Sequence, residues 1–345
     1  MKKLISTTVG LVALGFALSA GTASARDLTV VSWGGNYQDA QREIYFKPFA
    51  EKTGKPVLEE SWDGGYGVIA AKMETVPANW DVVQVEAEEL ALGCADGLYE
   101  QVDWSALGGE DKFIPSAVNE CGVGAIVWTT GLSYDGDKLK EAPQSWADFW
   151  DTEKFPGKRG FRRGPKYALE FALMADGVKP EEVYEVLGTD EGIDRAFAKL
   201  DALKSDIVWW EAGAQPIQLL ASGEAPIGFF WNGRLAALAA DGMPVGISWE
   251  NNITAADALV VPKGAPNKEA AMAFIAEATS AQAQADFATK TGYAPINTGS
   301  AELMDAEIRK TLPDTQTATQ INADMAYWAE HRDEIGTRWY AWQAE

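Results

Sequence analysis

The chain has 345 residues, of which 47% are apolar and 23% are charged, and its net charge at pH 7 is −22. This composition is that of an ordinary globular protein without a low-complexity tract, and so strong a negative charge disfavours binding to nucleic acid or to anionic membranes. A chain of this length is more than one hydrophobic core usually supports, so we expect two lobes.

Residues 1–25 have the three parts of a secretory signal peptide. Lys2 and Lys3 form the positive end, residues 11–18 the apolar core, and an Ala-Ser-Ala cleavage site ends at Ala25. The apolar stretch is too short and too interrupted by glycine to span a bilayer, although an uncleaved anchor is the alternative. No later segment is apolar enough to span one, and no lipobox cysteine follows the signal. We therefore expect a soluble, monomeric periplasmic protein.

Two cysteines, Cys94 and Cys121, occur in the chain. In an exported protein an even number of cysteines predicts a disulfide, and two buried free thiols are the alternative. A catalytic cysteine would need a histidine partner, and the only histidine, His331, lies in the exposed-looking run AEHRDE.

Strands and helices alternate in the first 60 residues after the signal. The expected strands are 27–33, 56–61 and 80–86, and the expected helices between them are 37–54 and 68–76. This order predicts a parallel sheet in an α/β lobe.

A buried strand at 122–135 then leads into a second region. Its expected elements are a helix at 145–151, a basic turn at 155–166, three helices up to residue 204, strands at 206–213 and 224–233, and a helix between them. A strand at 256–265 returns to the first lobe, followed by one long helix at 267–292, the turn YAPIN and a helical remainder.

A chain that leaves one lobe and later returns to it predicts a cleft that closes on a ligand by hinge motion. We assign 26–130 and 255–300 to lobe 1, and 131–254 and 301–345 to lobe 2.

Motifs of common catalytic sites are absent from the sequence. There is no G-x-S-x-G elbow, H-E-x-x-H, P-loop or paired Cys motif, and one histidine gives poor support for a metal site. Glu86, Glu88 and Glu89 read as a solvated helix start. We therefore expect a protein that is not an enzyme and has no cofactor or metal, with an exported lyase or hydrolase as a weaker alternative.

Several motifs together resemble the periplasmic solute-binding proteins of ABC importers, and among them the spermidine/putrescine-binding type. These motifs are VVSWGGNYQDA, SYDGDKLKEAPQSWADFWD, LLASGEAPIGFFWNGR, DALVVPKGAPNKEAAMAFIAEATSAQAQADFA and GYAPIN. The resemblance covers essentially the whole mature chain. It implies a type II periplasmic-binding fold of two α/β lobes, with the ligand between them and an ABC permease of the inner membrane as partner.

The resemblance also implies site residues. Trp33 and Tyr37 match the aromatic pair after the first strand, Trp231 the aromatic of the W-x-G-x motif, Asp257 an ammonium-binding aspartate, and Tyr293 the aromatic after the long helix. Tyr66, in WDGGYG, is expected to close over the cleft.

The sequence departs from the polyamine-binding pattern at two places. Arg234 stands where those proteins have an acid, and Lys166 and Tyr167 replace an acidic pair. A guanidinium repels a diamine but matches a carboxylate, so Arg234 and Asp257 together suit a small zwitterion. This pattern resembles that of the γ-aminobutyrate (GABA) binders and predicts GABA or a related short ω-amino acid as ligand.

Other interpretations remain open. Arg234 could face away from a polyamine site, or pair with Asp257 without touching a ligand, and a sensory role is not distinguished from transport. Trp209, Trp210 and Glu211 are divided between the cleft and the core. The basic cluster Arg159, Arg162 and Arg163 reads as a solvated surface or a contact patch.

Overall fold

The computed structural model describes residues 26–74, 79–316 and 319–344, so the predicted signal at 1–25 lies outside the described residues. The strands form one mixed sheet in the order β2-β1-β3-β9-β4-β7-β5-β6, with β10 added to β9 and β8 added to β4. The strands are β1 (Leu28–Ser32), β2 (Val57–Ser61), β3 (Val82–Val85), β4 (Val123–Asp135), β5 (Arg159–Arg162), β6 (Ile207–Trp210), β7 (Ile227–Trp231), β8 (Val245–Ile247), β9 (Ile253–Val260) and β10 (Ile321–Asn322).

The α-helices of the described residues are distributed among the strands along the chain. They are α1 (Gly35–Gln41), α2 (Lys47–Thr53), α3 (Tyr66–Glu74), α4 (Ala87–Ala95), α5 (Trp146–Trp150), α6 (Ala168–Ala175), α7 (Val183–Leu187), α8 (Asp190–Asp201), α9 (Gln215–Ser222), α10 (Asn232–Ala240), α11 (Lys268–Ala278), α12 (Ala281–Thr291), α13 (Ala306–Arg309) and α14 (Met325–Ala344).

The first three strands form the parallel sheet that the sequence predicts. β1 pairs in parallel with both β2 and β3, and every residue of β1 and β3 is buried. Burial of both faces is typical of parallel strands that are covered by helices. The sheet as a whole is mixed, because β9 runs antiparallel to both β3 and β4.

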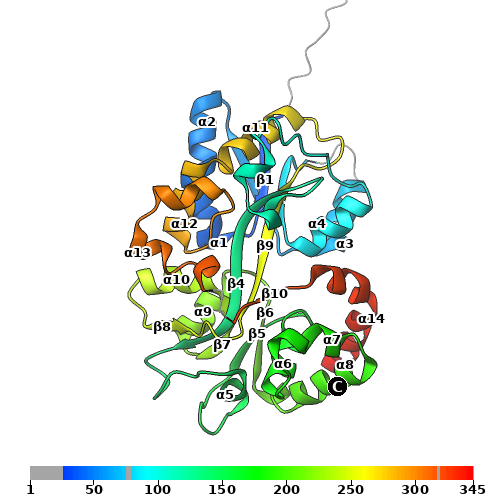
Figure 1. Cartoon of the computed structure of the whole chain (residues 1–345), viewed down its shortest axis with the longest axis vertical. Coiled ribbons are helices and arrows are strands. Elements are labelled where there is room, and N and C mark those ends of the chain that lie inside the picture. Colours follow the sequence, from blue (N-terminus) through cyan, green and yellow to red (C-terminus); the bar gives the residue numbers. More distant parts are fainter. Residues whose placement is uncertain (1–25, 75–78, 317–318, 345) are drawn as a thin grey trace, which may run out of the picture.

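Two strands, β4 and β9, connect the two halves of the molecule. Figure 1 shows them running lengthwise through the middle, with α1–α4, α11 and α12 around the upper half and α5–α9 around the lower half. β4 pairs with β9 from Val123 to Thr130 and with β7 from Thr130 to Tyr134. The predicted α/β class with two α/β halves is therefore confirmed.

Two expected elements differ in the structure. The long helix predicted at 267–292 is divided into α11 and α12, because the Ser280 hydroxyl accepts a bond from the Ala283 amide and caps a new helix there. The predicted basic turn contains strand β5, which pairs in parallel with β6 from Arg159 to Arg162.

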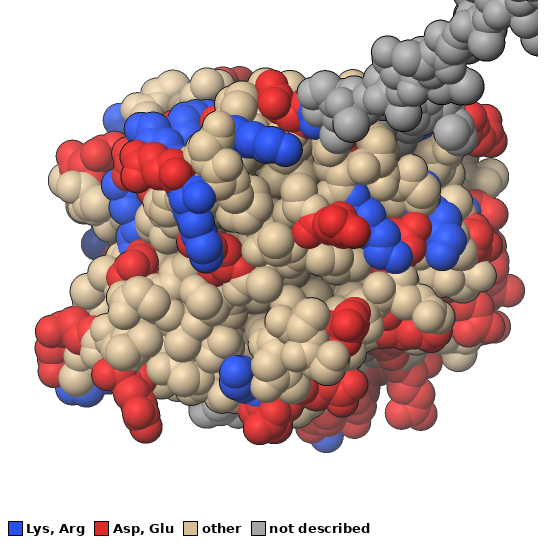
Figure 2. Space-filling view, turned by 90° about the horizontal axis from the view of Figure 1, so that it is seen from above, with Lys and Arg blue, Asp and Glu red and all other residues tan. Residues whose placement is uncertain are grey.

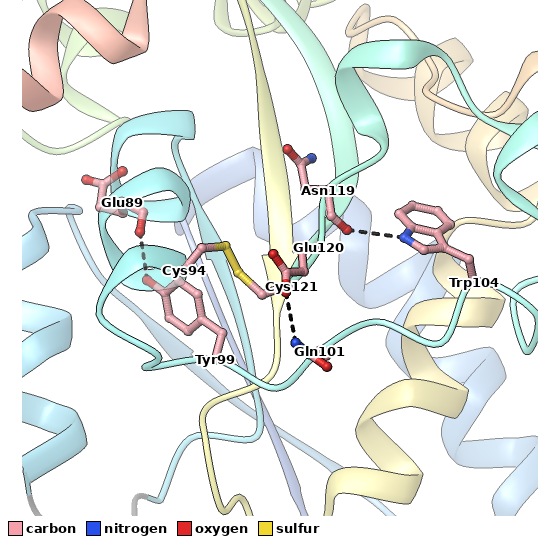
Figure 3. The surroundings of a disulfide bond; sticks show 8 residues. All are labelled: Glu89, Cys94, Tyr99, Gln101, Trp104, Asn119, Glu120 and Cys121. Carbon is pink, nitrogen blue, oxygen red and sulfur yellow. Dashed lines mark hydrogen bonds between the residues drawn. A yellow bond between two sulfur atoms is a disulfide. The ribbon is translucent and has the colours of Figure 1, made fainter.

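The predicted disulfide between Cys94 and Cys121 is confirmed (Figure 3). It joins the end of α4 to the segment that enters β4, with Cα atoms 5.9 Å apart. Nearby, the Tyr99 hydroxyl donates to the Glu89 carbonyl, 3.0 Å away. Cross-linking a loop of 27 residues stabilises a fold by about 3 kcal/mol, and here it fixes the position of α4 against β4.

Charged side chains of both signs are scattered over the upper end of the molecule. In Figure 2 basic side chains stand beside acidic ones, without a continuous positive surface on this face. No helix among the described residues combines the length and the apolar character needed to cross a bilayer.

Candidate functional site

A partly open cavity contains most of the predicted ligand-binding residues. Six of the seven predicted residues line it: Trp33, Tyr37, Trp231, Arg234, Asp257 and Tyr293. The remaining lining residues are Trp62, Asp63, Glu86, Ile126, Trp128, Arg162, Glu211 and Gly213.

Elements of the upper half and the central strands position three of these side chains. Trp33 follows β1 directly, Tyr37 lies on α1, and Asp257 lies on β9. Opposite Asp257, the register of β4 shifts between Gly124 and Ile126. A bulge of this kind re-aims a side chain, and strand ends of α/β sheets are common places for ligands.

The Trp-Asn-Gly motif positions the others at the junction of β7 and α10. Trp231 ends β7, and Arg234 lies in the first turn of α10. The Asn232 side chain accepts from the Thr129 amide at 3.0 Å and donates to the Gly292 carbonyl at 2.7 Å. Tyr293, just after α12, packs so closely that a Cβ on residue 233 would lie 2.3 Å from its ring, which explains the glycine there.

Asp257 is a buried carboxylate with three hydrogen-bond donors and no cation. Its side chain is 4% exposed and accepts from the indole N–H groups of Trp33 at 2.7 Å and Trp128 at 2.6 Å, and from Gln84 at 2.9 Å. Among the residues described, no lysine or arginine forms an ion pair with it. Burial, assisted by the charge of Glu86, raises the pKa of Asp257 to about 7 although the three donors oppose this shift. A cation in the cavity would favour the ionised form.

Arg234 is a buried guanidinium that no carboxylate neutralises within residues 26–74, 79–316 and 319–344. It is 2% exposed, and its nitrogens contact only neutral oxygens. Nη1 donates to Asn36 Oδ1 at 2.5 Å, and the Tyr293 hydroxyl, which is neutral too, also interacts with the guanidinium. The contacts to the carbonyls of Trp33 and Gly34 are 3.4 Å long, and the buried Nε has no partner. Weak contacts of this length leave donors for a stronger acceptor.

Aromatic rings enclose the space around these two charges. Trp33 stacks on Trp62 with centroids 5.4 Å apart, and Tyr37 meets the Tyr293 ring edge-on, also at 5.4 Å. The Arg234 Cζ atom lies 5.7 Å from the centroid of the Tyr37 ring. The arrangement provides one positive group, one negative group and apolar walls.

A second group of charges lies beside the cavity, between the upper and lower halves. Glu86, which precedes α4, forms ion pairs with Arg162 at 2.6 Å and with Lys166 at 2.8 Å, and Lys166 also pairs with Glu88 at 2.8 Å. Burial alone would raise the pKa of Glu86, but the two cations outweigh burial and lower it to about 2. Arg162 also lies over the Trp231 ring, 5.0 Å from its centroid.

Comparison with known proteins identifies the family. Residues 45–317 match the family described as bacterial extracellular solute-binding protein. The chain belongs to this family. A curated relative, the gamma-aminobutyric acid-binding protein of Pseudomonas aeruginosa, is 42% identical over 343 residues, covering 99% of this chain and 97% of the relative. The spermidine/putrescine-binding periplasmic protein of Escherichia coli is 23% identical over 283 residues, covering 78% of this chain and 79% of that protein.

Solved structures confirm the periplasmic-binding-protein fold. The structure of the Atu4243-GABA receptor is 51% identical, with a TM-score of 0.81, and the match covers 93% of this chain and 98% of that one. The periplasmic binding protein MotA of A. tumefaciens B6, in complex with glucopine, is 28% identical with a TM-score of 0.85, covering 92% and 100%.

One predicted residue of this binding protein, Tyr66, does not line the cavity. Its hydroxyl donates to Asp96, and its ring lies under Arg332 of α14, with 5.0 Å between Cζ and the ring centroid. Tyr66 therefore contacts the C-terminal helix instead of the ligand space.

Two predictions about charged clusters are wrong. Arg159 is fully buried and donates to the carbonyls of Phe149 and Gly157, and Arg162 lines the cavity, so of the basic cluster only Arg163 is exposed to solvent. Glu86 and Glu89 are buried and do not form a solvated helix start. Arg162 and Glu86 pair across the two halves, and a local sequence pattern does not reveal such pairing.

Sequence reasoning missed three further groups, Trp128, Gln84 and Glu86. Trp128 and Gln84 lie within buried strands, where the sequence does not distinguish a site residue from a core residue. Glu86 stands immediately after β3, the same strand-end position that pointed to Trp33, so this signal was available. Of the residues that the sequence left between the cleft and the core, Trp210 is buried and Glu211 lines the cavity. The described residues contain no cluster of three potential metal ligands.

Proposed function

We propose that this protein is the periplasmic substrate-binding component of an ABC importer, and that it captures GABA or a related short ω-amino acid without catalysing a reaction. One observation carries the proposal: Arg234 and Asp257 are buried, line the same cavity, and have no oppositely charged partner among the described residues. The two GABA-named proteins that resemble this chain at 42% and 51% identity support the same ligand.

Each end of a zwitterion has a matching group in the cavity. The carboxylate accepts two hydrogen bonds from the planar fork of Arg234. The ammonium pairs with Asp257, and the faces of Trp33 and Trp231 add about 0.5–2 kcal/mol of cation–π attraction. The methylene groups between the two ends lie against the tryptophan and tyrosine rings, where burial of apolar area favours binding.

The charge of Arg234 argues against a diamine. An ammonium about 4 Å from the guanidinium, at an effective dielectric constant near 20, would be repelled by about 4 kcal/mol. A polyamine ligand is the second candidate, because the relatives at 23% identity are named for spermidine and putrescine. It requires Arg234 to leave the cavity, whereas the side chain lines that cavity and is 2% exposed.

Closure of two lobes completes the proposal. With lobe 1 formed by 26–130 and 255–300 and lobe 2 by 131–254 and 301–345, closure brings Arg234 of α10 onto the carbonyls of Trp33 and Gly34. Closing removes water from both charged ends of the ligand and presents the closed form to the permease. Removal of residues 1–25 in the periplasm gives the monomeric mature form.

Calorimetry on the mature chain tests the proposal. We expect GABA, β-alanine or 5-aminovalerate to bind more tightly than putrescine and spermidine, and a ligand at 100 times its Kd to raise the free energy of unfolding by about 2.7 kcal/mol. Butyrate and butylamine, which each lack one charged end, serve as controls and should bind weakly. Tighter binding of putrescine than of every ω-amino acid would overturn the proposal, and turnover of a bound ligand would show an enzyme.

A further inference from the structure

The ion-pair cluster beside the cavity joins the two halves of the molecule. Glu86 and Glu88 belong to the start of α4 in the upper half, whereas Arg162 ends β5 and Lys166 lies between β5 and α6, both in the lower half (Figure 1). All four side chains are at most 16% exposed. Ion pairs so deeply buried are strongly coupled, and removal of one partner leaves an uncompensated charge.

The cluster is electrically neutral, since two carboxylates face two cations. The third acid of this helix start, Glu89, is buried, and burial together with the charge of Glu86 raises its pKa. Two other acids that line the cavity, Asp63 and Glu211, are exposed to solvent, and water screens their charges. Arg234 and Asp257 are consequently the uncompensated buried charges of the cavity lining within the described residues.

If Glu86 lost its cationic partners Arg162 and Lys166, it would add an uncompensated negative charge to the cavity lining. It lines the cavity together with Asp257, and its negative charge is felt at the Asp257 carboxyl. Two buried acids in one cavity, opposed by a single arginine, would attract a ligand with two positive charges and repel a carboxylate. The salt bridges of Glu86 to Arg162 and Lys166 remove this attraction.

We infer that Arg162 and Lys166 determine the charge selectivity of the cavity: by neutralising Glu86 and Glu88 they make it accept a zwitterion and reject a diamine. The inference rests on the proposed function and adds to it two positioning residues that act through Glu86. Lys166 does not line the cavity, so its substitution leaves the groups around the ligand in place.

The test compares three variants of the mature chain by the ratio of the Kd for putrescine to the Kd for GABA. Lys166→Met leaves one net negative charge in the cluster. Lys290→Met is the matched control, because Lys290 pairs with Glu43 on the surface and its loss changes the net charge equally. Lys166→Met combined with Glu88→Gln restores a neutral cluster and keeps the pair of Glu86 and Arg162.

We expect Lys166→Met to lower this ratio on the order of tenfold, the control to leave it unchanged, and the double variant to restore it. An unchanged ratio in Lys166→Met overturns the inference, and so does a ratio that remains low in the double variant, since a merely structural role would not be rescued by charge. Lys166→Gln repeats the test if the methionine variant fails to fold. Wild-type protein that prefers putrescine would contradict the proposed function instead.

Discussion

Replacing Arg234 by methionine removes a charge that the structure leaves without an anionic partner. The guanidinium is 2% exposed, contacts the backbone oxygens at 3.4 Å, and has an unpartnered Nε. Truncating one partner of a buried, hydrogen-bonded charge pair costs about 2–5 kcal/mol of binding free energy. We therefore expect Arg234→Met to weaken GABA binding by roughly 30- to 4,000-fold.

The same substitution should not destabilise the ligand-free protein to a similar degree, because a buried charge without a partner is itself unfavourable. Calorimetry with GABA and butylamine, combined with thermal unfolding, separates the two effects. Butylamine has no carboxylate, so its affinity should not fall. Arg42→Met, at a half-exposed arginine paired with Glu59, is the control. Equal losses of affinity for GABA and butylamine would refute the assignment of Arg234 to the carboxylate.

Three further outcomes are expected. Because burial raises the pKa of Asp257 to about 7, binding of the GABA ammonium at lower pH must displace a proton from this carboxyl. The Kd for GABA should therefore rise about tenfold for each pH unit below 7 and stay constant above it. Asp257→Asn should abolish this pH dependence, and a flat profile in the wild type would contradict the prediction. Gly213→Ala should weaken GABA binding by roughly tenfold or more, because the new Cβ would lie 2.7 Å from Arg234 Nη2; unchanged affinity would show that the arginine tolerates displacement. Cys94→Ser with Cys121→Ser should lower the free energy of unfolding by about 3 kcal/mol with little effect on the Kd, as measured by denaturant titration; an equal stability would contradict a contribution from the disulfide.

Much of the fold follows from local patterns in the sequence. The alternation of apolar strands and amphipathic helices places β1, β2, β3, β6 and β7 where the structure has them, and Gly54 ends α2 in the left-handed conformation at φ 68°. The break at Ser280 was missed because the apolar spacing of 267–292 continues through it. A single capping hydroxyl decides this boundary.

The candidate site could be predicted only in part. Trp33 and Arg234 stand at a strand end and a helix start, where local sequence already indicates a ligand, whereas Trp231 and Asp257 were found through resemblance to a family. Arg162 could not be assigned in this way. Its burial depends on Glu86, 76 positions earlier in the chain, and pairing over such a separation leaves no periodic signal.

The orientation of the bound ligand tests the central claim most directly. A crystal structure of the mature protein with GABA should place the carboxylate oxygens about 2.7–2.9 Å from the Arg234 guanidinium and the ammonium at a similar distance from the Asp257 carboxylate, with the methylene chain against Trp33 and Tyr37. Density that places either end of GABA on other groups, or that shows Arg234 turned out of the cavity, would contradict the account.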